Sequence, residues 1–453
     1  MKLKLLLPFF VCVFPMLAHA AGAGDHPAQK ACIVEVDAVN NDAANLEKYW
    51  FYRQRLRNEF IFLSDKDEPG SNLPASIRRG SMLQWSDAPI MLAQYISMLA
   101  TEYALLNGRD EAAAMMSLRE LLWALRVIDR LDRRGEAYFR ADRSEHEGDF
   151  NGFFIRDDID ANFLHRNPID LATSVLSDLT KPAGDLPGYY ATEMSQDQVW
   201  HLLMGLALVE KLVPFKGGID GEVVDMRRWV RKTVFRIVSY MRDHSNWQIQ
   251  NPVFGKPVLR GAEWDAQHVF SWGFAEAANA LLVPHDAGDE TYPNMHNLTS
   301  RLAQPLFRLA LLGKSDNYNQ RILSTIARAN YAVGLFSFGG PLWKLEHEVL
   351  SRNRYRYEQM PLLFVVLHGT DLRIDPTVYG GLLNAAPEYG TFNYGDQYNV
   401  CAWSSTSRLV WPEDNETTKP WLLGDYNGLD YMLLHNLYQL VYNQAQLDKL
   451  YRH

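Results

Sequence analysis

The sequence is poor in cysteine and in long hydrophobic runs, and it has no block of one charge. Its 453 residues include 3 cysteines, and after the first twenty residues no segment is apolar for long enough to span a bilayer. The formal net charge is -9, without a long Lys/Arg block, which argues against nucleic acid or an anionic membrane as the main partner. The hydrophobic fraction of 47% is typical of a globular protein with a large core.

Motifs that bind metals, phosphates and dinucleotides are also missing. There is no H-E-x-x-H spacing, and Glu346, His347 and Glu348 are consecutive, so they cannot face one ion from a helix. The sequence contains no G-x-S-x-G, no P-loop and no Rossmann glycine pattern, and Cys401 lies in no nucleophile motif. We therefore expect neither a metal nor an organic cofactor.

The first twenty residues have the order of a secretory signal. Lys2 and Lys4 precede an apolar stretch at residues 5–17, and Ala18-His19-Ala20 fits a cleavage site of the A-x-A type. We expect residues 1–20 to be removed and the remaining chain to be periplasmic or secreted, with no membrane anchor left.

Two cysteines remain after this cleavage, Cys32 and Cys401. In an oxidising compartment they can form a disulfide between the N-terminal segment and the distant C-terminal region, and the alternative is two separate buried thiols. Their separation does not fit a zinc motif.

Two kinds of helix alternate along the chain. Residues 89–106 and 199–213 are apolar nearly all round, whereas residues 110–134 and 222–243 carry an apolar stripe opposite charged side chains. An apolar helix should be buried and a striped helix should cover it. A third unit begins at 266–283, and further helices are expected at 43–63, 298–312, 318–335, 356–367 and 429–443. The alternation predicts an all-α fold with one domain over residues 21–453, a double layer of helical hairpins whose closed form is an (α/α)6 toroid.

Residues 137–160, "AYFRADRSEHEGDFNGFFIRDDID", interrupt this pattern. Two short aromatic runs around a polar, glycine-containing turn predict a β-hairpin inserted at the rim. Neighbouring strand residues face opposite sides, so Asp157 and Asp158 cannot both point into one site. One of them is a candidate catalytic carboxylate, and Arg156 is a candidate to hold its partner or a substrate carboxylate. The alternative is a solvated acidic hairpin tip.

The expected inner helices share a feature, because four of them begin with an acidic residue near an aromatic one. The residues concerned are Gln84, Trp85 and Asp87 before the first helix, Asp197, Trp200 and His201 in the second, Trp264, Asp265 and His268 in the third, and Tyr426 before the last. Each group alone can be a helix cap, and each histidine can be a satisfied core residue. In a toroid, however, the starts of the inner helices gather at one end. Their recurrence therefore predicts a pocket lined by carboxylates, indoles and amides.

The helix alternation, the "RDDI" segment, "EMSQDQVWHLLMGLALV" and "YNGLDYMLLHNLYQLVY" together resemble the six-hairpin glycosidase superfamily, in particular exported (α/α)6-toroid proteins of polysaccharide-degrading bacteria. The resemblance covers most of the mature chain and lies in the order and character of the helices. It implies a carbohydrate cleft at one end of the ring, where Asp residues near the inner-helix starts do acid and base work without a metal.

The leading hypothesis is a glycoside hydrolase acting on an oligosaccharide or polysaccharide. Cleavage of a glycosidic bond needs two carboxyl groups. Asp158 or Asp157 would supply one, and Asp197 or Asp87 the other. The side chains expected to bind the sugar are Trp85, Trp200 and Trp264 by stacking, and Gln84 and His201 by hydrogen bonds to hydroxyls.

Two alternatives remain open at this point. A polysaccharide lyase acting on a uronate-containing glycan would need a base and a cation, for which Tyr189, Tyr190, His201 and Arg260 are present. A non-catalytic envelope protein that binds glycans or has a structural role would use the acidic helix starts only as caps.

Overall fold

A computed structural model describes residues 41–61, 72–85, 88–159, 196–243, 376–386 and 425–451, and a few single or paired residues between these ranges. This part of the chain is mostly helical, which agrees with the expected all-α class. None of its helices combines the length and the apolar character needed to cross a bilayer.

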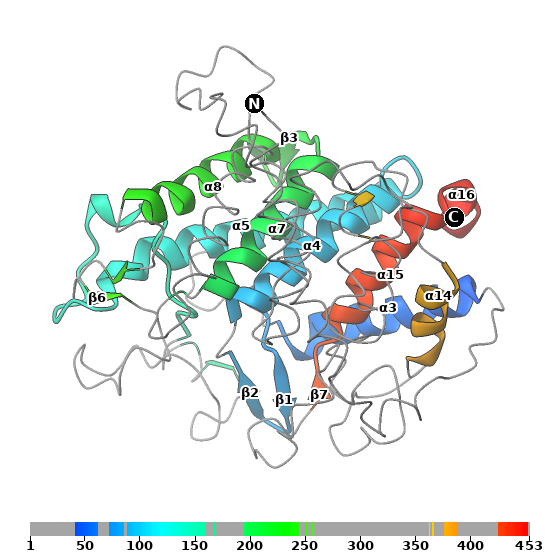
Figure 1. Cartoon of the computed structure of the whole chain (residues 1–453), viewed down its shortest axis with the longest axis horizontal. Helices are drawn as coiled ribbons and strands as arrows, with labels where there is room; N and C mark the ends of the chain where they lie inside the picture. Colours follow the sequence, from blue (N-terminus) through cyan, green and yellow to red (C-terminus); the bar gives the residue numbers. More distant parts are fainter. Residues whose placement is uncertain are drawn as a thin grey trace, which may run out of the picture.

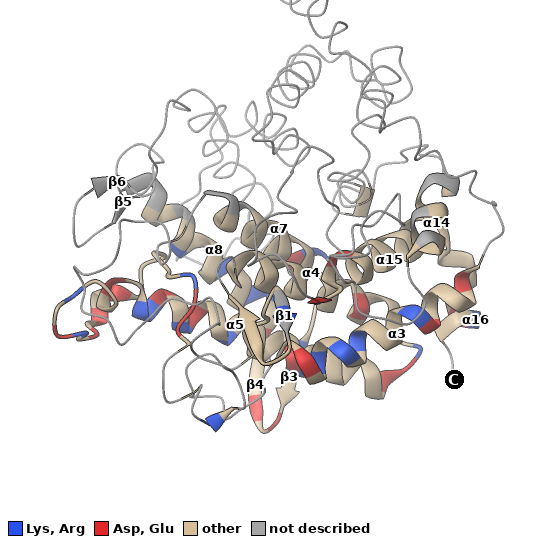
Figure 2. Cartoon of the chain, turned by 90° about the horizontal axis from the view of Figure 1, so that it is seen from below, with Lys and Arg blue, Asp and Glu red and all other residues tan. Residues whose placement is uncertain are grey.

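Helix α4 (Ala88–Leu106) lies at the centre, and α5 (Glu111–Ala137), α7 (Gln196–Leu212) and α15 (Leu429–Tyr442) pack against it (Figure 1). Around these, α3 (Asp42–Glu59) and α14 (Pro376–Ala385) pack on α15, and α8 (Met226–Asp243) packs on α7 and α5. Charged side chains are frequent on α3 and α5 and rare on α4, α7 and α15 (Figure 2). The expected distinction between apolar buried helices and striped covering helices is confirmed for α4, α7 and α5, whereas α3 has no apolar stripe and buries several of its charged side chains.

The bounds of most expected helices agree with the structure to within a few residues, but two predictions need correction. Residues 222–225 form strand β4 (Glu222–Asp225) rather than the first turn of α8, because Asp220 and Gly221 take positive φ and turn the chain into a hairpin with β3 (Lys216–Ile219). Helix α14 was not expected, since its ten residues show no clear stripe. The helices expected at 266–283, 298–312 and 318–335 lie outside the described residues, and of the helix expected at 356–367 only residues 362, 365 and 366 are described, all of them helical.

A small antiparallel sheet joins the segments that lead into α4 and α15. Strand β1 (Ile77–Arg79) lies between β2 (Met82–Gln84) and β7 (Asp425–Tyr426), and Ile77 is opposite both Gln84 and Tyr426. Strand β2 leads into α4, and β7 leads into α15. The sheet therefore brings together the first turns of two helices that are far apart in the sequence. A separate short pair, β5 (Gln250–Asn251) and β6 (Lys256–Pro257), completes the described strands.

The β-hairpin expected at residues 137–160 is not formed over the described residues 137–159. Helix α5 continues to Ala137, turns follow, and η1 (Glu147–Asp149) is a single 3-10 turn. Arg140 closes this loop by donating two hydrogen bonds of 2.6 Å to the carboxylate of Asp149. The aromatic runs reflect packing onto helices rather than strand pairing, since Phe153 and Phe154 are fully or almost fully buried in the helical core.

Glycines allow residues 150–155 to approach the helices closely. A Cβ on Gly135 of α5 would lie 2.1 Å from the carbonyl oxygen of Phe153. Gly152, with φ +103°, would place a Cβ 2.3 Å from the carbonyl oxygen of Arg236 on α8. No side chain fits at either position, so the segment lies directly against the backbones of both helices.

Candidate functional site

The first turns of α4 and α15 meet at one end of the helical core. The side chain of Gln94, in the second turn of α4, donates a hydrogen bond of 2.9 Å to the carboxylate of Asp430, in the first turn of α15. Figure 1 shows α4, α7 and α15 running in the same general direction, each starting on the side of the β2-β1-β7 sheet. Within the described residues, the first turns of α4 and α15 therefore lie together, and α7 begins on the same side.

The acidic segment at residues 153–159 runs to this same end. The amide of Ile155 donates to the carbonyl of Leu131 on α5 at 3.3 Å, and the amide of Met194 donates to the carbonyl of Phe154 at 3.1 Å. Met194 lies two residues before α7 begins at Gln196. The backbone that carries Asp157 and Asp158 is thus anchored beside the stretch that carries Asp197.

Asp157 and Asp158 are both fully buried, so the alternative of a solvated acidic tip is wrong. Asp158 accepts two hydrogen bonds from Arg130 of α5, from Nε at 2.6 Å and from Nη2 at 3.2 Å. One carboxylate oxygen of Asp157 accepts from the amide of Ile159 at 3.3 Å, as in a tight turn. The guanidinium that holds Asp158 belongs to Arg130, which the sequence argument did not single out, and Arg156 is half-buried nearby in the chain.

The residues expected to bind sugar beside α4 and α15 are core residues in the structure. Trp85 is fully buried, and its indole N–H donates to the carbonyl of Leu73 at 3.0 Å. Gln84 and Tyr426 are also buried, in the sheet that joins the two helix starts. The burial of Trp85 corrects its expected role as a stacking platform, because an indole with no accessible face cannot receive a sugar ring.

Other predicted residues are described only in part or lie outside the described residues. His201 is half-buried in α7, and for Asp197 and Trp200 only the helical backbone is described. The positions outside the described residues are Asp87, Trp264, Asp265, His268, Tyr189, Tyr190, Arg260, Cys32 and Cys401, together with the signal segment.

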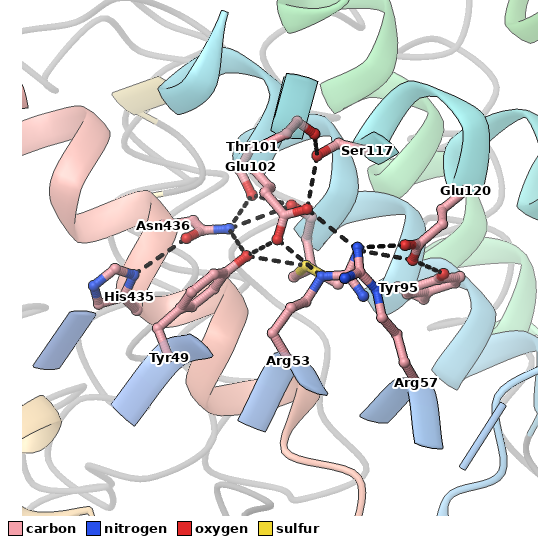
Figure 3. A network of polar contacts seen from close by, with 12 residues as sticks. Tyr49, Arg53, Arg57, Tyr95, Thr101, Glu102, Ser117, Glu120, His435 and Asn436 are labelled. Atoms are coloured by element: carbon pink, nitrogen blue, oxygen red, sulfur yellow. Dashed lines mark hydrogen bonds and ion pairs between the residues drawn. The ribbon is translucent and has the colours of Figure 1, made fainter. Parts of the chain in front are cut away.

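A second polar cluster lies deeper in the core, where α3, α4, α5 and α15 meet (Figure 3). Arg53 of α3 is fully buried and binds Glu102 of α4 at 2.9 Å and Glu120 of α5 at 2.7 Å. Arg57 also pairs with Glu120, at 2.5 Å. Two guanidinium groups and two carboxylates thus balance in charge. Burial would raise the pKa of Glu120, but Arg53 and Arg57 together hold it below its ordinary value.

Neutral side chains add further hydrogen bonds to this cluster. Ser117 donates to Glu102 at 2.7 Å, and the hydroxyls of Tyr49 and Tyr95 donate to Glu102 and Glu120. Burial and the adjacent carboxylates raise the pKa of both tyrosines well above its ordinary value, so both remain hydroxyl donors. The cluster joins four helices and is largely buried, with Arg57, 27% exposed, as the most accessible of its four charged side chains, so we regard it as an element of structure rather than a binding site.

A third buried group surrounds Asp132 of α5. Its carboxylate accepts from the amides of Asn151 at 3.1 Å and Gly152 at 2.7 Å, and from Nε of Arg236 at 2.9 Å. Burial raises the pKa of Asp132 to about 6, although Arg236 and the amide of Gly152 act in the opposite direction. These bonds secure residues 150–152 between α5 and α8.

Two of the residues that form these contacts had a recognisable signal in the sequence. Gln94 and Glu102 are polar residues inside α4, a helix that is otherwise almost entirely apolar. A polar side chain in a buried helix must find a partner, because leaving it unpaired costs about 1–3 kcal/mol. Gln94 binds Asp430, and Glu102 binds Arg53. Their presence was readable from the sequence, whereas the identity of their partners was not.

Within the part of the chain that the structure describes, no group of three or more His, Cys, Asp or Glu side chains is arranged to hold a metal ion. Comparison with protein-family models, with curated proteins and with solved structures found no match to this chain.

Proposed function

We propose that this protein is an exported carbohydrate-active enzyme, a glycoside hydrolase that cleaves an oligosaccharide with a pair of aspartates. The observation that carries the proposal is the position of residues 153–159. Hydrogen bonds to Leu131 and Met194 bring the segment with Asp157 and Asp158 beside the start of α7, which carries Asp197. Glycoside hydrolysis requires two carboxyl groups on either side of the scissile bond, and these two elements would supply one each.

We further propose that the helices close into an (α/α)6 toroid in a single domain over residues 21–453. In support, the late helix α15 packs against α4, and α7 packs against α4 as well, so the three have the order expected of neighbouring inner helices. In further support, α5 packs on α4, α8 packs on α7 and α3 packs on α15, as outer helices would pack on inner ones. The gathered inner-helix starts would then face the substrate.

In this mechanism the two carboxyl groups have different roles. A guanidinium only donates hydrogen bonds, so Asp158 meets Arg130 as an acceptor on both oxygens. We therefore propose Asp158 as the base or nucleophile, with Asp197 or Asp87 donating the proton to the leaving oxygen. Because the carboxylate of Asp158 is fully buried, residues 153–159 must move for a substrate to reach it. Asp157 is the alternative to Asp158 on the same segment. His201, Trp200 and residues 264–268 are proposed to contact the sugar, and Arg156 to favour an acidic one.

The test is turnover of a broad panel of oligosaccharides, neutral and uronate-containing, by the chain without residues 1–20. Reducing ends and absorbance from unsaturated products are measured together. We expect new reducing ends without absorbance, and loss of turnover in Asp158→Asn and Asp197→Asn while both variants stay folded by circular dichroism. Asp220→Asn is the matched control, because Asp220 also binds an arginine, Arg119, through two hydrogen bonds of 2.8 Å but on the exposed surface.

Each other outcome contradicts a defined part of the proposal. Absorbance from a new double bond would mean elimination rather than hydrolysis, and so a lyase. Full activity in Asp158→Asn would remove Asp158 from the mechanism. Binding of a panel member without any turnover would indicate a glycan-binding protein.

A further inference from the structure

The seam between α3 and α15 contains a histidine in an unusual position. His435 is fully buried in α15 and stacks on Tyr49 of α3, with ring centroids 4.9 Å apart and planes 27° apart. On its own helix Tyr431 lies roughly parallel to it, with centroids 6.2 Å apart. The imidazole is therefore a packing element of the seam as well as a titratable group.

The hydrogen bonds around Asn436 define which imidazole nitrogen carries the proton. The amide nitrogen of Asn436 donates to the hydroxyls of Tyr49 and Thr101, each at 3.2 Å, and to the carbonyl of Met98 at 3.3 Å. Its amide oxygen therefore faces Nδ1 of His435, at 3.2 Å. Because an oxygen accepts, Nδ1 must be the protonated nitrogen and Nε2 the bare one (Figure 3).

Proton uptake by His435 must then occur at Nε2, which is buried and has no hydrogen-bond partner within the described chain. An unprotonated imidazole nitrogen costs less free energy in this buried position than an N–H would. Protonation there adds both a charge and a hydrogen-bond donor without an acceptor. We propose that protonation of His435 at Nε2 opens the seam between α3 and α15, so that acid loosens these two helices before the rest of the helical core.

The charges near the seam favour this outcome. The ammonium of Lys48 on α3 lies 5.7 Å from the centre of the Tyr431 ring and is held by the carbonyls of Leu383 and Ala386. Helix α4 contributes one charged residue, Glu102, which is already bound by Arg53 and Tyr49. The elements α14 and η5 (Gln444–Gln446) contribute only Tyr379 as a titratable group.

A new cation in the seam therefore meets Lys48, while the nearest carboxylate of α4, Glu102, is already bound by Arg53 and Tyr49. The carboxylates of α3 lie toward its ends, at Asp42 and Glu59, and at the exposed Glu47. In agreement, burial lowers the pKa of His435 from 6.5 to about 4; the hydrogen bond with Asn436 acts in the opposite direction, and Lys48 lowers the pKa further.

Hydrogen–deuterium exchange of the mature protein tests the proposal. Between about pH 7.5 and about pH 4.5, we expect exchange of α3 and α15 amides, corrected for intrinsic rates, to rise about 10²-fold. Exchange in α7 and α8 should change much less. His435→Asn keeps a donor toward Asn436 and His435→Phe keeps the stacking, yet neither titrates, so both should lose the rise. His146→Asn, a change at an exposed histidine, should keep it.

Two results would overturn the proposal. One is the wild-type rise persisting in both His435 variants, and the other is equal loss of protection in α7 and α8 at the same pH. Nitrogen NMR of wild-type His435 gives a check that needs no folded variant. We expect a protonated Nδ1 and a bare Nε2 at neutral pH, and the opposite tautomer would contradict the argument.

Discussion

Replacing Arg53 by methionine removes the central charge of the buried cluster while nearly preserving the length of the side chain. Arg53 is fully buried and joins Glu102 and Glu120, which come from two different helices. In the variant, Arg57 still pairs with Glu120, but Glu102 keeps only neutral donors such as Tyr49 and Ser117. The change therefore leaves one buried carboxylate without a counter-ion.

We expect the free energy of unfolding of Arg53→Met to fall by about 3–5 kcal/mol, the usual cost of removing one partner of a buried ion pair. The double variant Arg53→Met/Glu102→Gln removes the orphaned charge as well, so it should recover about 2 kcal/mol or more of this loss. A double variant that is more stable than the single variant indicates that the loss of stability comes from the unpaired charge rather than from poorer packing.

Urea unfolding of the mature protein measures these differences. Arg126→Met is the matched control, because Arg126 lies on α5 and pairs with the exposed Glu222, where an ion pair contributes about 0–1 kcal/mol. A loss below about 1 kcal/mol in Arg53→Met, or a double variant no more stable than the single one, would refute the reasoning.

Two further predictions concern α5 and α7. The raised pKa of Asp132 means that its contribution to stability is fully present below pH 3.8 and is lost as pH rises through about 6. The stability of wild type relative to Asp132→Asn should therefore fall by up to about 3 kcal/mol between about pH 4 and about pH 8 in denaturant titrations, and a flat difference would contradict the shift. A Cβ on Gly205 of α7 would lie 2.7 Å from the carbonyl oxygen of Ala93 on α4, so Gly205→Ala should cost about 1–3 kcal/mol despite its better helix propensity. Gly148→Ala, where nothing lies within 4 Å, is the control, and a gain of thermal stability in Gly205→Ala would show that the helices are not in close contact.

Local pattern predicted the helices well and the connecting segments less well. The apolar run that becomes α4 and the stripe that becomes α5 reflect the side of each helix that must leave water, a property contained in a short stretch of sequence. The aromatic runs at residues 138–155 carry the same information about burial. They do not say whether the partner is a strand or a helix, and here the partners are α5 and α8.

In the candidate site, too, the sequence predicted the residue types but not their surroundings. The acidic character of residues 157–158 was evident from the sequence, but their burial and the part of Arg130 were not. Trp85 was expected to stack on a sugar, but it is a fully buried core residue whose indole N–H donates to the carbonyl of Leu73.

What the sequence by itself determined is the helical class, the order of buried and covering helices, and the presence of polar residues such as Gln94 and Glu102 that require partners. These follow from local periodicity and from the cost of burying a polar group. Only the tertiary structure decided the partners. Gln94 binds a residue 336 positions away, and Arg53 gathers two carboxylates from two other helices. Such pairings depend on how the helices pack in space. A hydrogen bond forms only when donor and acceptor lie about 3 Å apart, and here the packing of distant helices, not the neighbouring residues in the chain, sets that distance.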